Sequence, residues 1–126
     1  MQSDEDTIFA LSTAPGRAAV AIIRVSGPKS RSVAVALGFT MPLPRVVGLK
    51  WLRDNGRILD QSVVLWFENP SSYTGEDLVE LQVHGGRAVY DSVISVLARQ
   101  SSFRYADPGE FSRRAVLNGR LDLTEA

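Results

Sequence analysis

The stretch that decides the fold class is LVELQVHGGRAVYDSVISVLAR, residues 78–99. Over 78–83 the side chains alternate, so that Glu80 and Gln82 lie on one face and only Val and Leu on the other, as in a β-strand. After Gly85 and Gly86, apolar side chains recur with the spacing of an amphipathic helix over 87–99: Val89, Val93, Val96 and Leu97. A strand followed directly by a helix indicates an α/β domain.

Further elements are predicted on both sides of this stretch. Runs rich in apolar and β-branched residues predict strands over 7–11, 18–25, 46–53, 58–67 and 103–105. Asn55-Gly56 lies between two of these runs and is a strong hairpin signal. Helices are predicted over 28–37, with Pro28 near the first position and Gly38 as terminator, and over 110–118. The order of elements predicts an α/β (α+β) fold, with a mixed β-sheet, a hairpin and about three helices.

Composition excludes several classes of protein. The chain has 126 residues, 44% hydrophobic and 22% charged, with equal numbers of acids and bases and no cysteine. Disulfides, thiolate metal sites and a cysteine nucleophile are therefore excluded, and no metal site is predicted. The apolar runs are far shorter than the roughly 18 residues that a membrane-spanning helix needs, so no membrane partner is expected. Zero formal net charge argues against a general nucleic-acid coat.

The ends of the chain suggest a fragment. Acidic residues at positions 4–6 are unlike a signal or transit peptide, so any such peptide is expected to be absent or already removed. Thr124 resembles a helix N-cap with nothing after it. We therefore expect the front piece of a longer protein.

The glycine-containing motifs do not indicate nucleotide binding. Neither G-x-x-x-x-G-K-[ST] nor G-x-G-x-x-G occurs, so this chain is not expected to bind GTP. His84 precedes Gly85 and Gly86 between the predicted strand and helix, where backbone N–H groups could receive an anion. A tight turn is the other interpretation, and a lone histidine forms neither a metal cluster nor a triad.

Acidic residues near the central strand have two interpretations each. Glu76 and Asp77 could do acid/base chemistry, but neighbours on an extended segment point to opposite faces, which favours a turn with a solvated Glu76. Thr74 or Asp77 would then cap or bond the backbone. Glu80 lies on the most strand-like segment and needs a partner, either a structural arginine such as Arg24 or a ligand with paired N–H donors.

Basic and aromatic residues also leave alternatives open. Arg113, Arg114 and Arg120 cluster near the carboxyl end among acids, which predicts a solvated or interface helix, with an anion site as the alternative. Trp51 and Trp66 lie on the two arms of the hairpin. Core or subunit-interface packing is their expected role.

Several motifs carry a family resemblance along the whole chain. They are, in order, TI (7–8), PGR (15–17), IIRVSG (22–27), YTGED (73–77), ELQVHGG (80–86), PGEFSRRA (108–115) and LNGRLDL (117–123). In order and spacing these motifs resemble the amino-terminal part of the MnmE/TrmE family of tRNA-modification GTPases.

The resemblance implies a folate-binding and dimerisation domain over 1–120, similar in fold to the folate-binding domain of the glycine-cleavage T-protein. Residues 121–126 would begin a helical domain. The cofactor would be 5-formyltetrahydrofolate or 5,10-methylenetetrahydrofolate, held near a homodimer interface. Arg24 and Glu80 match folate-contacting positions of the family, and Arg120 stands where its members usually carry lysine. The resemblance implies no catalytic residue in this chain.

For the full-length protein the resemblance implies a GTP hydrolase, with GTP, Mg²⁺ and K⁺ bound only in a separate GTPase domain. With an FAD-dependent partner of the MnmG type, it would modify C5 of the wobble uridine in certain tRNAs. The Gln82-Val83-His84 sequence and the pair Arg113-Arg114 look more like mitochondrial members, so the mitochondrial matrix is expected, with the bacterial cytoplasm as the alternative. Two other classes remain: a small RNA-binding module without a cofactor, using Arg113, Arg114 and Arg120, and a small hydrolase centred on His84.

Overall fold

A six-stranded sheet forms the body of the domain in the computed structural model, which describes residues 6–12, 20–84 and 86–119. Its strands run in the order β3-β4-β5-β2-β1-β6. In chain order they are β1 (Thr7–Leu11), β2 (Val20–Ser26), β3 (Gly48–Asp54), β4 (Arg57–Phe67), β5 (Leu78–His84) and β6 (Phe103–Tyr105). The pair β1 and β6 is parallel and the other pairs are antiparallel, which confirms the predicted mixed sheet.

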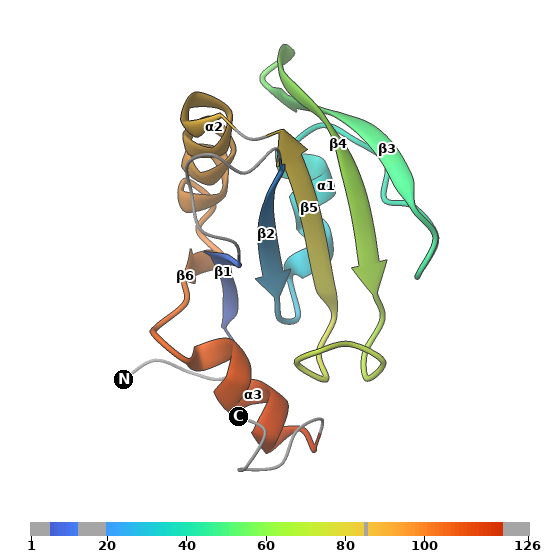
Figure 1. Ribbon diagram of the computed structural model, residues 1–126, viewed down its shortest axis with the longest axis vertical. Coiled ribbons are helices and arrows are strands. Elements are labelled where there is room, and N and C mark those ends of the chain that lie inside the picture. The colour runs from blue at the N-terminus through green and yellow to red at the C-terminus, as the bar shows by residue number, and fades with distance from the viewer. Residues whose placement is uncertain (1–5, 13–19, 85, 120–126) are drawn as a thin grey trace.

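Helices and strands share one core. The helical elements are the 3₁₀ turn η1 (Ser30–Ser32), α1 (Val33–Ala36), α2 (Arg87–Ala98) and α3 (Glu110–Leu117). Side chains of α1 and α2, such as Val33 and Leu97, join the inward-facing residues of β2, β4 and β5 in one buried cluster. Figure 1 shows α1 behind β2 and β5, and α3 at the end of the sheet beside β1. The sheet face that carries Arg24 and Glu80 points away from this core.

Local signals account for the turns. Asn55 and Gly56 have φ values of 50° and 85°, as a two-residue hairpin turn requires, and the predicted hairpin of β3 and β4 is confirmed. Gly38, with φ 69°, ends α1 as predicted. The first helix is shorter than the predicted 28–37, because the hydroxyls of Ser30 and Ser32 bond the carbonyls of Asp77 and Lys29 and favour a 3₁₀ turn there.

Gly27 brings three segments together at one end of the sheet. Its φ is 134°, and a Cβ at this position would lie 2.7 Å from the Cα of Thr7. The N–H of Gly27 donates to the carbonyl of Asp77 at 3.0 Å. Only glycine permits this close approach. The turn after β2 therefore packs directly on the start of β1 and on the loop before β5.

Candidate functional site

Arg24 and Glu80 face each other across the antiparallel pair β2 and β5. Nε of Arg24 donates to Oε1 of Glu80 at 3.1 Å, and their side chains are 35% and 12% exposed. Nε2 of Gln82 donates to the other carboxylate oxygen, Oε2, at 3.0 Å. The predicted partner of Glu80 is thus present, and both carboxylate oxygens already accept a hydrogen bond.

A cavity of about 460 Å³ lies beside Arg24. Its described lining comes from β1, β2, the loop before β5 and the segment leading into α3, and comprises Ala10, Leu11, Ser12, Arg24, Tyr73, Ala106, Asp107, Pro108, Gly109, Glu110, Phe111 and Ser112. Glu80 contacts Arg24 without itself being among these residues. The YTGED and PGEFSRRA motifs, 30 residues apart, therefore meet Arg24 at one cavity.

Tyr73 and Ser112 complete one wall of the cavity. The guanidinium carbon of Arg24 lies 5.7 Å from the ring centroid of Tyr73. The hydroxyl of Tyr73 and Oγ of Ser112 are 3.1 Å apart. Sequence reasoning did not single out either residue as part of a site, although each belongs to a quoted motif. Their positions depend on where the loop before β5 meets α3, which no local pattern encodes.

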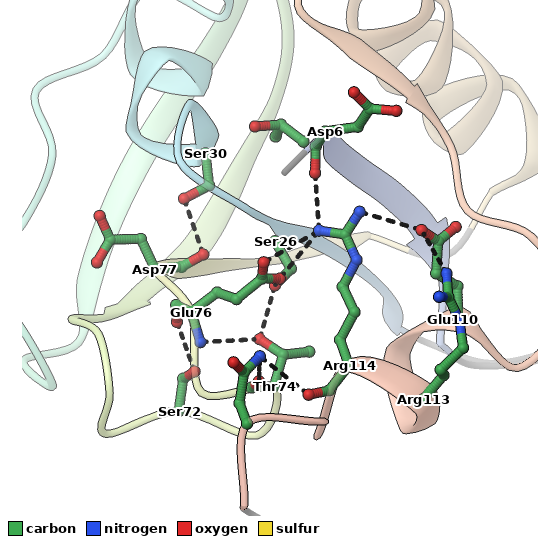
Figure 2. Close-up of polar contacts among 12 residues, drawn as sticks. Asp6, Ser26, Ser30, Ser72, Thr74, Glu76, Asp77, Glu110, Arg113 and Arg114 are labelled. Atoms are coloured by element: carbon green, nitrogen blue, oxygen red, sulfur yellow. Dashed lines mark hydrogen bonds and ion pairs between the residues drawn. The ribbon is translucent and has the colours of Figure 1, made fainter. Parts of the chain in front are cut away.

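A network of two arginines and two glutamates holds α3 against the end of the sheet, and Figure 2 shows three of its members, Glu76, Glu110 and Arg114. Nη1 of Arg114 donates to both carboxylate oxygens of Glu76 at 3.1 Å, and Nη2 donates to Oε2 of Glu110 at 3.0 Å. Arg104 of β6 donates to both oxygens of Glu110, at 2.8 and 2.6 Å. We call Glu76, Arg104, Glu110 and Arg114 the arginine–glutamate network.

Two predictions about this network are wrong. Glu76 is not solvated: its side chain is 16% exposed and accepts bonds from Arg114 and from the hydroxyl of Ser26 at 2.8 Å. Arg114 does not lie on a solvated helix face, because its side chain is only 1% exposed. The two charges compensate each other inside the protein, 38 residues apart in sequence. Arg114 is therefore inaccessible to RNA, which removes it from the alternative RNA-binding module that would use Arg113, Arg114 and Arg120.

Glu110 is ionised within the network. Burial alone would raise the pKa of this carboxyl group, but the bonds from Arg104, from the N–H of Asp107 and from Arg114 outweigh it and lower the pKa to about 2. The bond that Arg104 donates to Glu110, together with its bond to Asp6, raises the pKa of Arg104 above its ordinary value. Glu110 is the first residue of α3 and also lines the cavity, so the network fixes the cavity wall from behind.

Other predicted roles near the site are confirmed as structural. Oγ1 of Thr74 accepts the N–H of Glu76 at 3.4 Å, and Oδ1 of Asp77 accepts the N–H of Asn69 at 2.8 Å. The N–H of Gly86 donates to the carbonyl of His84 at 3.0 Å, which fits a tight turn. Nδ1 of His84 lies 2.9 Å from Oδ1 of Asp60, a contact that sequence reasoning did not anticipate.

Trp66 is buried in the core, as predicted, whereas Trp51 is 45% exposed at the edge of the sheet. Arg120 lies outside the residues that the structure describes. Within the described ranges, no group of three or more His, Cys, Asp and Glu side chains is placed to hold a metal ion. None of the described helices is long and apolar enough to cross a membrane.

The site can bind a planar, anionic molecule. Of the N–H groups of Arg24, only Nε–H donates to Glu80. No other described carboxylate forms an ion pair with this guanidinium. Its two Nη groups can therefore donate to a ligand carboxylate as a bidentate pair. Two aromatic residues, Tyr73 and Phe111, line the same cavity.

Comparison with known proteins agrees with the motifs. The family model described as "GTP-binding protein TrmE N-terminus" matches residues 7–120. The tRNA modification GTPase MnmE of Caulobacter vibrioides is 54% identical over 121 residues, covering 96% of this chain and 27% of that protein. The mitochondrial tRNA modification GTPase mss1 of Schizosaccharomyces pombe is 49% identical over 123 residues, covering 94% of this chain and 25% of that protein. The chain thus spans about a quarter of the length of these relatives.

Proposed function

The chain belongs to the family of the TrmE N-terminus, and from that premise we propose that it is the tetrahydrofolate-binding and homodimerisation domain of a tRNA-modification GTPase. The observation that carries the proposal is the meeting of Arg24, the YTGED loop and the PGEFSRRA segment at one cavity. These segments are far apart in sequence and close around a space in which a guanidinium and two aromatic rings are available.

The cavity suits the chemistry of a reduced folate. Folate joins a planar pterin with N–H donors to a benzoyl ring and a glutamate tail with carboxylates. Arg24 would pair with a carboxylate of the ligand, and Tyr73 and Phe111 would pack on a ring. Glu80, which is proposed as a folate-contacting residue as well, would accept N–H donors only by giving up or sharing its bonds with Arg24 and Gln82. Arg120 is the third proposed contact.

When bound, 5-formyltetrahydrofolate or 5,10-methylenetetrahydrofolate would supply a one-carbon unit. The residues of this chain would bind and orient the cofactor, and they carry no proposed catalytic role. The ionised Glu110 in the wall would remain paired with Arg104 and Arg114, leaving the cationic group at Arg24 to meet the ligand's negative charge.

Homodimerisation is supported by the sheet face that carries Arg24, since it includes half-buried apolar side chains such as Ile22, Val63 and Leu65. A second copy would bury this face. A cofactor held beside Arg24 would then lie near the interface between the two copies.

In the full-length protein we propose GTP hydrolysis in a separate domain that binds GTP, Mg²⁺ and K⁺. The proposed partners are an MnmG-type FAD-dependent protein and tRNA, and the proposed product is a modified C5 of the wobble uridine. Named relatives include bacterial and mitochondrial proteins. The mitochondrial matrix is our proposed location, and the bacterial cytoplasm is the alternative.

Calorimetric titration of the chain with 5-formyltetrahydrofolate tests the cofactor, and sedimentation equilibrium tests the dimer. We expect saturable folate binding at one site per chain. We also expect the mass to rise from that of one chain to that of two chains as the protein concentration increases. Absence of heat at high micromolar folate would contradict the cofactor assignment. A mass that stays monomeric over the same range would contradict dimerisation of this chain.

A further inference from the structure

Ion pairing divides the cationic residues into two groups. Arg24 and the described arginines beyond residue 57 all pair with carboxylates: Arg87, Arg99, Arg104, Arg113 and Arg114. The other six form no ion pair with a carboxylate of the described ranges, and all fall between residues 29 and 57: Lys29, Arg31, Arg45, Lys50, Arg53 and Arg57. The zero net charge of the chain therefore conceals a positive segment.

This positive segment is not neutralised from within. Its only acidic residue is Asp54, and Nη2 of Arg99 already donates to Oδ2 of Asp54 at 2.8 Å. Unpaired cations on one part of a surface attract polyanions even when the whole molecule is neutral. The other acids lie outside this segment, at positions 4–6, 60, 68, 76, 77, 80, 91, 107, 110, 122 and 125.

Two of the six cations line a groove between α1 and the edge strand β3. The groove has a volume of about 480 Å³, and its described lining is Ala34, Val35, Gly38, Phe39, Thr40, Leu49, Lys50, Trp51 and Arg53. The N–H of Arg53 donates to the carbonyl of Leu37 at 2.7 Å, which fixes the strand against the end of α1. The positions of Lys50 and Arg53 in this groove are thus set by the backbone.

An aromatic ring completes the groove. Trp51 is exposed and lies between Lys50 and Arg53 in sequence. Trp66, in contrast, is buried, and the guanidinium of Arg31 lies 4.7 Å from its ring centroid. The indole of Trp51 is therefore the tryptophan available to an external planar group. Lys50 and Trp51 are neighbours on β3, so their side chains leave opposite faces of the sheet, and the groove runs along the strand edge between them. Cationic groups and an exposed indole along one edge are the groups that bind phosphates and stack on unpaired bases.

We propose that the groove between α1 and β3 binds RNA, with Lys50 and Arg53 on backbone phosphates and an unpaired base stacked on Trp51. The choice of RNA among polyanions rests on the proposed function, which makes tRNA the polyanion that this domain meets. The groove and the folate cavity share no lining residue among those described. The two sites can therefore be tested separately.

Fluorescence anisotropy with a labelled tRNA transcript tests the cations. The double variant Lys50→Gln with Arg53→Gln should weaken binding at least tenfold. It should also reduce the slope of log K against log salt by about 1.4 to 1.8, the contribution of two cations. The matched control removes the same charge outside the groove, with Arg57→Gln and Arg87→Gln, and should stay within twofold of wild type. Equal weakening by both double variants would overturn the groove, because net charge alone would then explain binding.

Intrinsic fluorescence tests the stacking. The tRNA should quench the emission of the wild-type chain, and Trp51→Phe should remove most of the quenching while keeping the affinity within threefold. Trp51→Ala should weaken binding about tenfold at an unchanged melting temperature. Undiminished quenching in Trp51→Phe would overturn the stacking role. Retention on phosphatidylglycerol vesicles with no binding of tRNA would overturn RNA as the occupant.

Folate titration of the Lys50→Gln, Arg53→Gln variant separates the two proposals. Unchanged folate binding with lost tRNA binding is the expected result. If the wild-type chain binds folate but not tRNA, RNA binding by the groove is overturned and the folate proposal stands. Groove-dependent tRNA binding without any folate binding would overturn the cofactor and support the groove.

Discussion

Nη2 of Arg114 lies 3.0 Å from Oε2 of Glu110, one helical turn away, and the two side chains are 1% and 0% exposed. Neither charge is tolerated in the interior without the other, because removing one partner of a buried pair leaves an uncompensated charge. The same arginine reaches Glu76 of the loop before β5 and the carbonyl of Asp6 before β1. The side chain of Arg114 therefore links α3 to two distant segments. It also holds Glu110, which lines the cavity, in place.

Glu110 should make the stability of the domain depend on acid pH. Its pKa is about 2 when folded and about 4.5 as the ordinary value, so its stabilising contribution is present above pH 4.5 and is lost as the pH falls toward 2. We expect about 3 kcal/mol of unfolding free energy from this group at neutral pH. Urea denaturation of wild type and Glu110→Gln between pH 7 and pH 2.5 measures it. The two proteins should differ most at neutral pH and converge in acid, and parallel curves would contradict the prediction.

Arg24→Ala should weaken folate binding much more than it weakens the fold. A charge-assisted bond to a ligand contributes roughly 1.5–3 kcal/mol, which corresponds to about a 10- to 150-fold change in affinity. The pair with Glu80 is part-buried, and Gln82 still donates to Glu80 in the variant, so we expect a cost to stability of about 1 kcal/mol. Calorimetry and thermal unfolding on the same protein separate the two effects. Loss of folding together with loss of binding would indicate a structural pair.

Glu80→Gln distinguishes a contacting role from a positioning role. If Glu80 accepts N–H donors of the ligand, affinity should fall roughly 10-fold or more while the melting temperature stays near that of wild type. Asp91→Asn, which removes an exposed carboxylate on α2, is the matched control and should leave affinity unchanged. Unchanged folate affinity in a folded Glu80→Gln protein would remove Glu80 from the ligand contacts.

Tyr73 should contribute through its ring rather than its hydroxyl. Tyr73→Phe keeps the ring beside Arg24 and loses the contact with Ser112, so folate affinity should fall less than threefold. Tyr73→Ala removes the ring and should cost about tenfold, as expected of an aromatic contact. Titration calorimetry on both variants measures the difference. A larger loss in Tyr73→Phe than in Tyr73→Ala would assign the binding to the hydroxyl.

Gly27→Ala should destabilise the domain more than Gly56→Ala. Both glycines have positive φ, so both substitutions strain the backbone. Only at Gly27 would the new Cβ collide with backbone, at 2.7 Å from the Cα of Thr7, whereas nothing lies within 4 Å at Gly56. We expect an excess cost of about 1–3 kcal/mol at Gly27, measured by urea denaturation. Equal costs would show that the contact with β1 is not tight in solution.

The sequence by itself determined the elements and most of their ends. The alternation over 78–83 and the helical spacing over 87–99 predict β5 and α2, because side-chain periodicity follows directly from backbone geometry. Asn55-Gly56 predicts the hairpin because few residues adopt positive φ. The strand predicted over 18–25 corresponds to β2, which continues to Ser26, and residues 18 and 19 lie outside the described ranges. The family motifs identified the family, and the matching family model over residues 7–120 confirms it.

Only the tertiary structure decided the partners of the charges. Glu76 was expected to be solvated, but its side chain is only 16% exposed because Arg114, 38 residues later, folds back onto it. Arg24 meets Glu80 because β2 pairs with β5 in one particular register, and that register depends on the whole core. The six cations without ion pairs are distinguishable from the others only once the pairs are known. Periodicity is a local property of the chain, whereas the compensation of a charge depends on whatever the fold places within about 4 Å of it.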